Sequence, residues 1–216
     1  MHKKKLEQRS FTFEVRAQQD DEGYILTGRP VVYNSRTNLG LFDEVIESGA
    51  LDGTDLTDVR FLVNHDLSRI PMARSRRNNG NSTMQLTPDA QGLNLDWVRL
   101  DVDNNAEARA LYSAVGRGDL DGMSMMFSID GERWEGLETD HPTRFITKIG
   151  SIVEVSAVTF PAYDATTIQA RSREALESAR SALESARQQQ AAAVDTAEEQ
   201  RQLELAKAKL TLLGGF

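Results

Sequence analysis

The sequence contains no cysteine and only three histidines, and these two shortages restrict its possible chemistry. Without cysteine the chain cannot form disulfides, thiolate zinc sites or a cysteine nucleophile. His2 lies among the charged first residues, which leaves His65 and His141 as candidate bases. Two histidines at no familiar ligand spacing make a poor metal site. We therefore expect neither a metal nor another cofactor.

Long apolar runs are also missing, and no segment is long and apolar enough to span a membrane. The opening "MHKKKLEQR" is basic, but charged and alternating residues follow it, which is unlike a secretory signal. The formal net charge of -8 argues against general nucleic-acid binding. We expect a soluble intracellular protein that uses no membrane and no specific nucleic acid as a partner.

The chain has 216 residues, of which 39% are hydrophobic, and this suffices for one domain with a core and an appended segment. The composition predicts three parts: a flexible basic N-terminus over residues 1–9, a domain over residues 10–170 and a helical extension over residues 171–216. Short strand-like stretches broken by turn residues fill the domain. The extension lacks proline and glycine until Gly214, which favours a helix.

The extension repeats A-L-E-S-A-R at a spacing of seven residues. Leu176, Ala179, Leu183 and Ala186 fall on the core positions of a heptad, but Gln190 interrupts the pattern and alanines bury little surface. This pattern predicts a weak coiled coil at most. The segment is either a long solvated helix or flexible arm, or an arm for assembly or targeting, through which the chain could form a homo-oligomer.

Alternating apolar residues predict strands, and one segment predicts a helix. The expected strands are residues 10–17, 23–35 and 58–66, a hairpin over 82–102 with a bulge around Trp97, the strand that carries Ser124, and a final pair over 143–150 and 151–160. The expected helix covers residues 104–118, with Asp103 or Asn104 as N-cap and with Ala106, Ala110, Leu111, Ala114 and Val115 as its buried face. Together these elements predict a mixed α+β domain built on a barrel or a strongly curved sheet.

Ser124 lies in the apolar run "GDLDGMSMMFS", either as a packed core serine or as a nucleophile. A serine attacks only when a base takes its proton. His65 directly follows the apolar strand of "VRFLVNHD", where a catalytic group is firmly held yet reachable, although a structural role fits the pattern too. His141 lies in a polar loop and needs no functional explanation.

Glu154 stands between Val153 and Val155 in an otherwise apolar strand. A buried carboxylate needs a partner, so Glu154 either faces solvent or accepts a hydrogen bond from a group such as an imidazole. In the second case it could orient His65. Ser156 shares the face of Glu154 and is a rival nucleophile or a supporting donor.

Three phrases carry a family resemblance: "LVNHD" around His65, "GDLDGMSMMF" around Ser124 and "VEVSAVTFPAYDAT" around Glu154. In this order they resemble the prohead (capsid maturation) serine proteases of tailed phages, as do "GRPVVYNSRT", "FDEVIESGAL" and "DAQGLNLD". The resemblance covers about residues 10–170. It implies an assemblin-like β-barrel ringed by a few helices, with Ser124 as nucleophile and His65 as general base. Glu154 matches the orienting acid, and Asp66 is another carboxylate near the histidine in sequence.

By the same resemblance, the chain is expected to be a serine endopeptidase of phage head maturation. Its partners and substrates would be the scaffolding protein or the scaffolding segment of the major capsid protein, and the protease itself. It would act in the host cytoplasm, inside the immature capsid. Two alternatives stay open: an inactive scaffold or internal head protein, and a metal-assisted hydrolase that uses His65, His141 and carboxylates.

Overall fold

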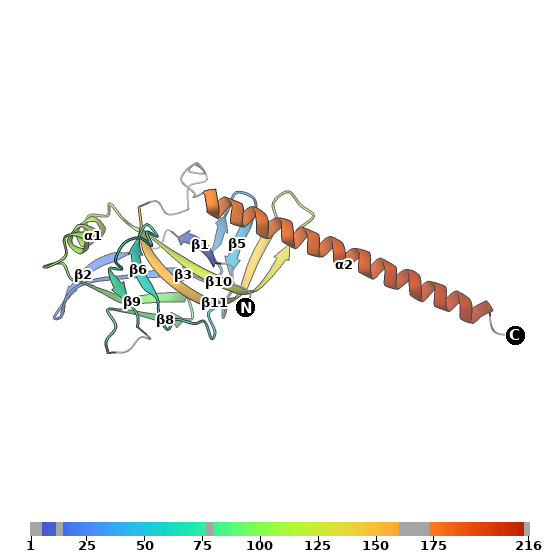
Figure 1. The fold of residues 1–216 in the computed structure, drawn as a ribbon, viewed down its shortest axis with the longest axis horizontal. Helices are drawn as coiled ribbons and strands as arrows, with labels where there is room; N and C mark the ends of the chain where they lie inside the picture. Colours follow the sequence, from blue (N-terminus) through green and yellow to red (C-terminus); the bar gives the residue numbers. More distant parts are fainter. Residues whose placement is uncertain (1–5, 12–14, 77–79, 160–172, 214–216) are drawn as a thin grey trace.

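The structure, a computed structural model, describes residues 6–11, 15–76, 80–159 and 173–213. These residues form a mixed α+β fold that is mostly sheet, with two helices (Figure 1). The strands are β1 (Leu6–Phe11), β2 (Arg16–Asp20), β3 (Gly23–Val32), β4 (Arg36–Asn38), β5 (Asp43–Ile46), β6 (Arg60–Val63), β7 (Ala73–Arg74), β8 (Met84–Asp89), β9 (Gly92–Leu100), β10 (Gly122–Glu135) and β11 (Thr143–Val158). The helices are α1 (Ala106–Gly116) and α2 (Arg173–Leu213).

A long hairpin of β10 and β11 forms the centre of a seven-stranded sheet. β1 pairs antiparallel with the outer edge of β10. The outer edge of β11 pairs in parallel with β5 near its start and with β6 near its end, while β4 and β7 extend those two strands. The end of β6 and the strand β1 therefore both reach the part of the hairpin where Ser124 pairs with Ser156.

The second sheet has four antiparallel strands in the order β2-β3-β9-β8. One hydrophobic core takes residues from both sheets, for example Leu26 and Leu95 from the small sheet and Phe61 and Phe127 from the large one. The expected closed barrel is not formed by the described residues, because their strands pair in two separate open sheets. The relation to assemblins, which depends on resemblance, stays a prediction.

Period-two alternation explains the serine in the methionine-rich run. Met123, Met125 and Phe127 of β10 are fully buried in the core. Since successive side chains of a strand point to opposite faces, Ser124 lies on the face turned away from that core. The same alternation in β11 places Val155 in the core and turns its neighbours Glu154 and Ser156 to the face of Ser124.

Several expected elements differ in extent from the structure. The predicted pair of strands over 143–160 is one strand, β11, which continues through Gly150. The predicted strand 10–17 is divided, since β1 belongs to the large sheet and β2 to the small one. Residues 6–9, expected as part of a flexible terminus, belong to β1. The hairpin of β8 and β9 is confirmed, and its register shift leaves Asp96 as the extra residue of the bulge.

The helix α1 forms as expected, but its cap and its buried face differ. Its N-cap is Asn105, whose side chain accepts hydrogen bonds from two backbone amides of the first turn. Ala108 is buried against the core, whereas Ala106 and Ala110 are exposed. The chain ahead of the helix turns at Asp101, so the helix begins later and a different stripe faces the sheet.

The helix α2 lies against the body at one end and then extends away from it (Figure 1). Leu183 is buried with Leu39 and Phe42 in a second small core, and Ala186 is buried beside it. Arg187 donates to two backbone carbonyls of the loop between β10 and β11, at 3.1 and 2.9 Å. Part of the predicted heptad stripe is thus covered by the chain's own body; the side chains of residues 176 and 179 lie outside the described part.

Neither described helix contains an apolar stretch long enough to cross a membrane.

Candidate active site

Ser124, His65 and Glu154 form a continuous chain of polar contacts. The Oγ of Ser124 lies 2.5 Å from Nε2 of His65, and Nδ1 of His65 lies 2.5 Å from Oε1 of Glu154. Ser124 and Glu154 are fully buried, while the side chain of His65 is 10% exposed. With a carboxylate at Nδ1, the nitrogen on that side carries a proton and Nε2 is directed at the serine. The structure brings all three predicted residues together.

His65 owes its place to a turn at the end of β6. Asn64 and His65 have φ values of 52° and 59°, a left-handed conformation that non-glycine residues seldom adopt. Asn64 stabilises it, because its side chain donates to Oγ1 of Thr159 at 3.1 Å and accepts from the Thr159 amide at 2.9 Å. This exchange ties the turn after β6 to the end of β11, the strand that carries Glu154.

Ser156 supports the acid and the base together. Its hydroxyl donates to Oε2 of Glu154 at 2.5 Å and accepts from the backbone amide of His65 at 3.2 Å. Both carboxylate oxygens of Glu154 therefore have a partner, as a fully buried carboxylate requires. Of the two roles that the sequence left open for Ser156, this geometry fits the supporting donor, because its hydroxyl proton is given to Glu154.

A further contact of Ser124 comes from β1, which the sequence did not indicate. The hydroxyl of Ser124 donates to the backbone carbonyl oxygen of Arg9 at 2.7 Å, and β1 pairs alongside β10 from Ser128 to Met123. The basic opening of the chain made the terminus look solvated. The only local signal for a strand was the alternation of Glu7 and Arg9 with their neighbours.

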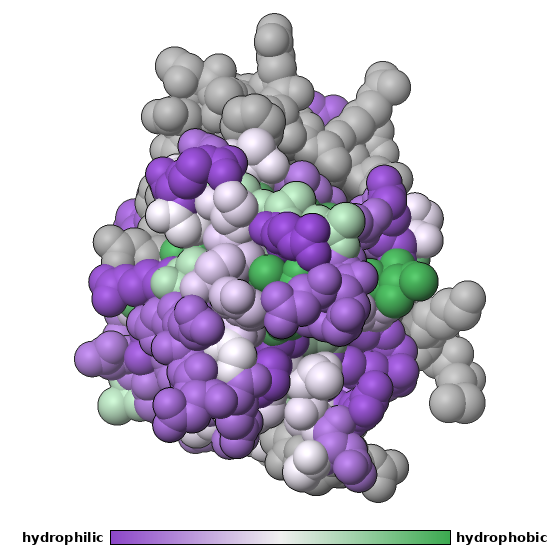
Figure 2. Space-filling view, turned by 90° about the vertical axis from the view of Figure 1, so that its left-hand side faces the viewer, coloured by the Kyte–Doolittle hydropathy of each residue, from purple (hydrophilic) through white to green (hydrophobic). Residues whose placement is uncertain are grey.

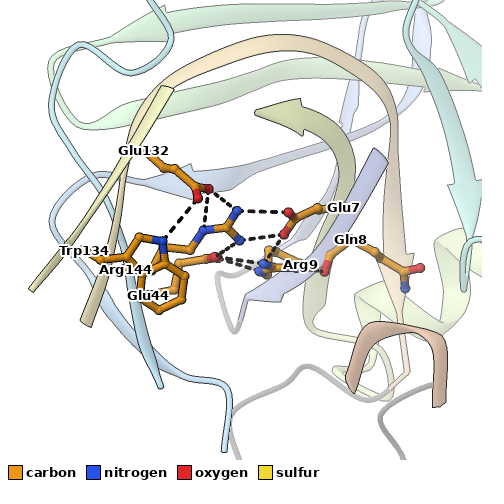
Figure 3. A network of polar contacts seen from close by, with 7 residues as sticks. All are labelled: Glu7, Gln8, Arg9, Glu44, Glu132, Trp134 and Arg144. Atoms are coloured by element: carbon orange, nitrogen blue, oxygen red, sulfur yellow. Dashed lines mark hydrogen bonds and ion pairs between the residues drawn. The ribbon is translucent and has the colours of Figure 1, made fainter. Parts of the chain in front are cut away.

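A buried cluster of charged side chains holds β1 in place on the face that carries Glu7 and Arg9 (Figure 3). Arg9 binds Glu44 through two nitrogens at 2.5 and 2.8 Å and binds Glu7 at 2.5 Å. Arg144 binds Glu7 at 2.8 and 3.0 Å and also contacts Glu44 and Glu132. Four of the five side chains, all except Glu132, are at most 5% exposed.

The charges of the cluster stabilise one another's ionised forms. Burial acts to raise the pKa of Glu7, but Arg9 and Arg144 outweigh it and lower that pKa to about 2. For Arg9, burial acts to lower the pKa, and Glu44 and Glu7 outweigh it so that the pKa is raised. Glu7 and Arg9 therefore remain charged within the folded structure at neutral pH.

A cavity of 440 Å³ lies next to the histidine, between α1 and the segment that follows β6. Asn64 and Asp66, which flank His65, line it together with apolar residues such as Leu111. Leu67 and Ile70 in the same segment are 62% and 85% exposed. Figure 2 shows this end of the molecule as mostly hydrophilic, with small apolar areas between the polar residues.

The remaining candidates lie elsewhere. Asp66 accepts hydrogen bonds from the amide and hydroxyl of Ser68 rather than from His65. His141 contacts Asp43 at 2.9 Å; it precedes β11, whereas Glu154 lies near the end of that strand. Within the described ranges, no three His, Asp or Glu side chains are grouped so that they could hold a metal ion.

Comparison with known proteins identifies the family. The sequence model of the caudovirus prohead serine proteases matches residues 11–180, which is more than half of the chain. The chain matches none of the curated proteins and none of the solved structures. The match begins at the last residue of β1 and ends within α2, so it includes all the other strands of both sheets and the contacts among Ser124, His65 and Glu154. This chain therefore belongs to the caudovirus prohead serine protease family.

Proposed function

We propose that Ser124 is the nucleophile of this protease, His65 its general base and Glu154 the acid that orients His65. The observation that carries this assignment is the unbroken chain of contacts from Ser124 through His65 to Glu154, each 2.5 Å long. A base within hydrogen-bond reach of a hydroxyl, and a third group that orients the base, are what nucleophilic catalysis by serine requires.

In the proposed reaction, Ser124 attacks the carbonyl carbon of a peptide bond while His65 takes the serine proton. The imidazolium that forms is stabilised by Glu154, which stays ionised. His65 then gives the proton to the leaving amine as the carbon–nitrogen bond breaks. A water molecule activated by His65 hydrolyses the acyl-enzyme and regenerates Ser124.

The proposed substrates are the scaffolding protein or the scaffolding segment of the major capsid protein, and the protease itself. Membership of the prohead protease family supports a site of action inside the immature capsid in the host cytoplasm. An autocleavage position near residue 171, at the predicted domain boundary, lies outside the described residues.

We also propose that α2 docks the protease onto other components during assembly or onto a second copy of the chain. Every described side chain from Gln188 to Leu205 is exposed, and the helix extends away from the body beyond its docked end (Figure 1). Loss of capsid processing when residues 172–216 are deleted would support docking, whereas normal packaging by that deletion variant would contradict it.

The direct test compares capsid components co-expressed with the unmodified chain, with Ser124→Ala and with Ser128→Ala. Ser128 is the matched control, because it is also buried in β10 but contacts Ser151 instead of the histidine. Intact-mass analysis follows processing. We expect the Ser124→Ala variant to lose all cleavage and Ser128→Ala to retain it.

Two other results would contradict the assignment. Equal processing by the unmodified chain and by Ser124→Ala would show that Ser124 is a packed serine. Absence of processing by every folded variant, with circular dichroism spectra matching the unmodified chain, would instead favour the inactive scaffold.

A further inference from the structure

The strand β1 lies where a protease substrate would lie. It is extended, pairs antiparallel with the strand that carries Ser124 and offers the carbonyl of Arg9 to the Ser124 hydroxyl at 2.7 Å. The carbonyl carbon is one bond of about 1.2 Å beyond that oxygen. It is therefore no more than about 4 Å from Oγ, close to the 3–3.5 Å of a reactive approach.

We propose that the site accepts β-strand segments with an acidic residue two positions before a basic one, and that it cuts after the basic residue. This inference rests on the proposed function of Ser124 and names its substrate class. Glu7-Gln8-Arg9 is the segment already in place, and Arg9–Ser10 is the peptide bond that it presents. Residues 6–10 lie outside the family match, which starts at residue 11.

The charges left behind when β1 departs support a basic residue at the cut. Glu7 and Arg9 leave together and remove no net charge, so Glu44, Glu132 and Arg144 remain with a net charge of minus one. Glu44 keeps one contact with Arg144 at 3.2 Å but loses the two bonds that Arg9 donates at 2.5 and 2.8 Å, and a carboxylate that loses its closest cation is destabilised. Glu44 then binds the guanidinium or ammonium of an incoming chain.

The same cluster selects the acidic residue. Arg144 contacts both oxygens of Glu7, in a two-point arrangement that matches a carboxylate. Gln8, between them, points to the opposite face because strand side chains alternate, and it is only partly buried. The middle position is therefore free to vary among substrates.

The occupied site also explains how cutting is restrained. A serine hydroxyl has one proton to donate. While Ser124 donates it to Arg9, the proton is not available to His65, and β1 excludes other chains from β10. Another substrate enters only when β1 leaves or has been cut.

The tripeptide Glu-Gln-Arg occurs a second time, as Glu199-Gln200-Arg201 in α2. All three side chains are exposed, and this part of the helix extends away from the body (Figure 1), so it can open locally at small cost. An opened copy presents the same side chains as β1. The subsite thus predicts a cut after Arg201 in the helical extension.

In each cut, Ser124 Oγ bonds to the carbonyl carbon of the arginine and the bond from that carbon to the next nitrogen breaks. His65 transfers the serine proton to the leaving amine. Water then attacks the ester, which releases a new arginine carboxyl end and restores the serine.

The test supplies a reporter protein with Leu-Glu-Gln-Arg-Ser-Phe in an unstructured linker, co-expressed with the full chain or with its Ser124→Ala variant. Matched reporters carry glutamine in place of the arginine or of the glutamate. We expect Ser124-dependent cleavage after the arginine. Cleavage of the arginine-free reporter should be slower by roughly 30-fold or more, since Glu44 then lacks the cation that Arg9 supplies in the occupied site. The reporters are changed and the residues of the charge cluster in the enzyme are not, so misfolding of an enzyme variant cannot produce this difference.

The second Glu-Gln-Arg segment, in α2, is tested by measuring the intact mass of the chain itself. We expect loss of residues 202–216 from the unmodified chain and not from Arg201→Gln, with slower loss in Glu199→Gln. Arg180→Gln is the matched control, because Arg180 is exposed on the same helix but has Ser178 two positions before it.

The outcomes separate the two proposals. Ser124-dependent cuts after neutral or acidic residues, or reporter rates that ignore the arginine, overturn the subsite and leave the proposed function intact. Reporter cleavage in a chain that keeps residues 202–216 overturns only the assignment of α2 as a substrate. Absence of any Ser124-dependent cut removes the proposed function and, with it, this inference.

Discussion

Ser156 joins the acid and the base of the site through a single hydroxyl. It donates to Glu154 and accepts from the backbone amide of His65, so its proton is not held for the bond to be cut. A residue in this position acts by holding others in place. Its contribution should therefore appear in the rate of the chemical step rather than in substrate affinity.

Replacing Ser156 with alanine is expected to lower kcat by about 10- to 100-fold with little change in KM, because one oxygen of a buried carboxylate loses its donor. Ser156→Thr keeps the hydroxyl and should restore most of the rate. Steady-state kinetics on the reporter would measure both. A Ser156→Ala rate no lower than that of Ser128→Ala would show that Glu154 does not need this bond.

At the scale of elements, β1 is held by charge as much as by strand pairing. The pKa of Glu7 is lowered from 4.5 to about 2 by Arg9 and Arg144, which outweigh the opposing effect of burial. A lowered pKa in the folded state means stabilisation that is complete above pH 4.5. It is lost as the pH falls from about 4.5 to about 2.

We therefore expect β1 to detach from β10 as the solution is acidified across that range. Hydrogen exchange of the amides in β1 and in the facing part of β10 measures the detachment. Glu7→Gln cannot gain this proton, so its exchange should be faster at pH 7 and should approach that of the unmodified chain near pH 2. Parallel pH profiles for the two proteins would show that Glu7 does not hold β1.

The turn between β8 and β9 depends on Gly92, because a side chain at this position would clash with β3. Gly92 has a φ of 146°, and a Cβ there would lie 2.1 Å from the carbonyl oxygen of Val31 in β3. Gly23, with a φ of 125°, has no atom within 4 Å of the same position. The two glycines thus separate the effect of backbone strain from that of a clash.

Gly92→Ala is expected to lower the free energy of unfolding by roughly 2–4 kcal/mol, since it adds a clash with backbone to the strain. Gly23→Ala should lower it by only about 1 kcal/mol, from strain alone. Urea titrations of both variants would measure the difference. Equal losses would mean that β3 moves aside without resistance.

At the scale of the whole molecule, two open sheets share one core, and α2 lies against the body at one end and then extends away from it (Figure 1). Leu183 and Arg187 of the helix contact the body, Ala186 is buried, and the described side chains from Gln188 to Leu205 are exposed. The stability of the body should therefore depend little on most of the helix. Loss of the contacts made by the turn that carries Leu183 should lower that stability.

A chain that ends after Gln188 is expected to unfold at the same temperature as the full chain, within about 2 °C. Leu183→Ala in the full chain should lower the free energy of unfolding by about 2 kcal/mol, because Leu183 fills the small core with Phe42. Thermal unfolding of both variants decides the point. A large loss from the truncation alone would reveal that the outer helix stabilises the body.

The sequence made Ser124, His65 and Glu154 candidates, because each is a polar residue within or just after an apolar strand, and the family resemblance supplied their expected roles. Ser124 and Glu154 each lie between two apolar residues, and His65 follows a mostly apolar strand after Asn64. The hairpin of β8 and β9 and the existence of both helices are also local properties. They depend on turn residues and periodicity within about 20 residues.

Only the tertiary structure decided which of these groups touch. His65 and Ser124 are 59 residues apart, and their contact depends on the pairing of β6 with β11 and of β11 with β10. Local pattern carries no information on such pairings, because they are chosen by the packing of the whole core. The same reason explains why β1, short and rich in charge, was missed: its charges are stable only beside Glu44 and Arg144, which strands far along the chain supply.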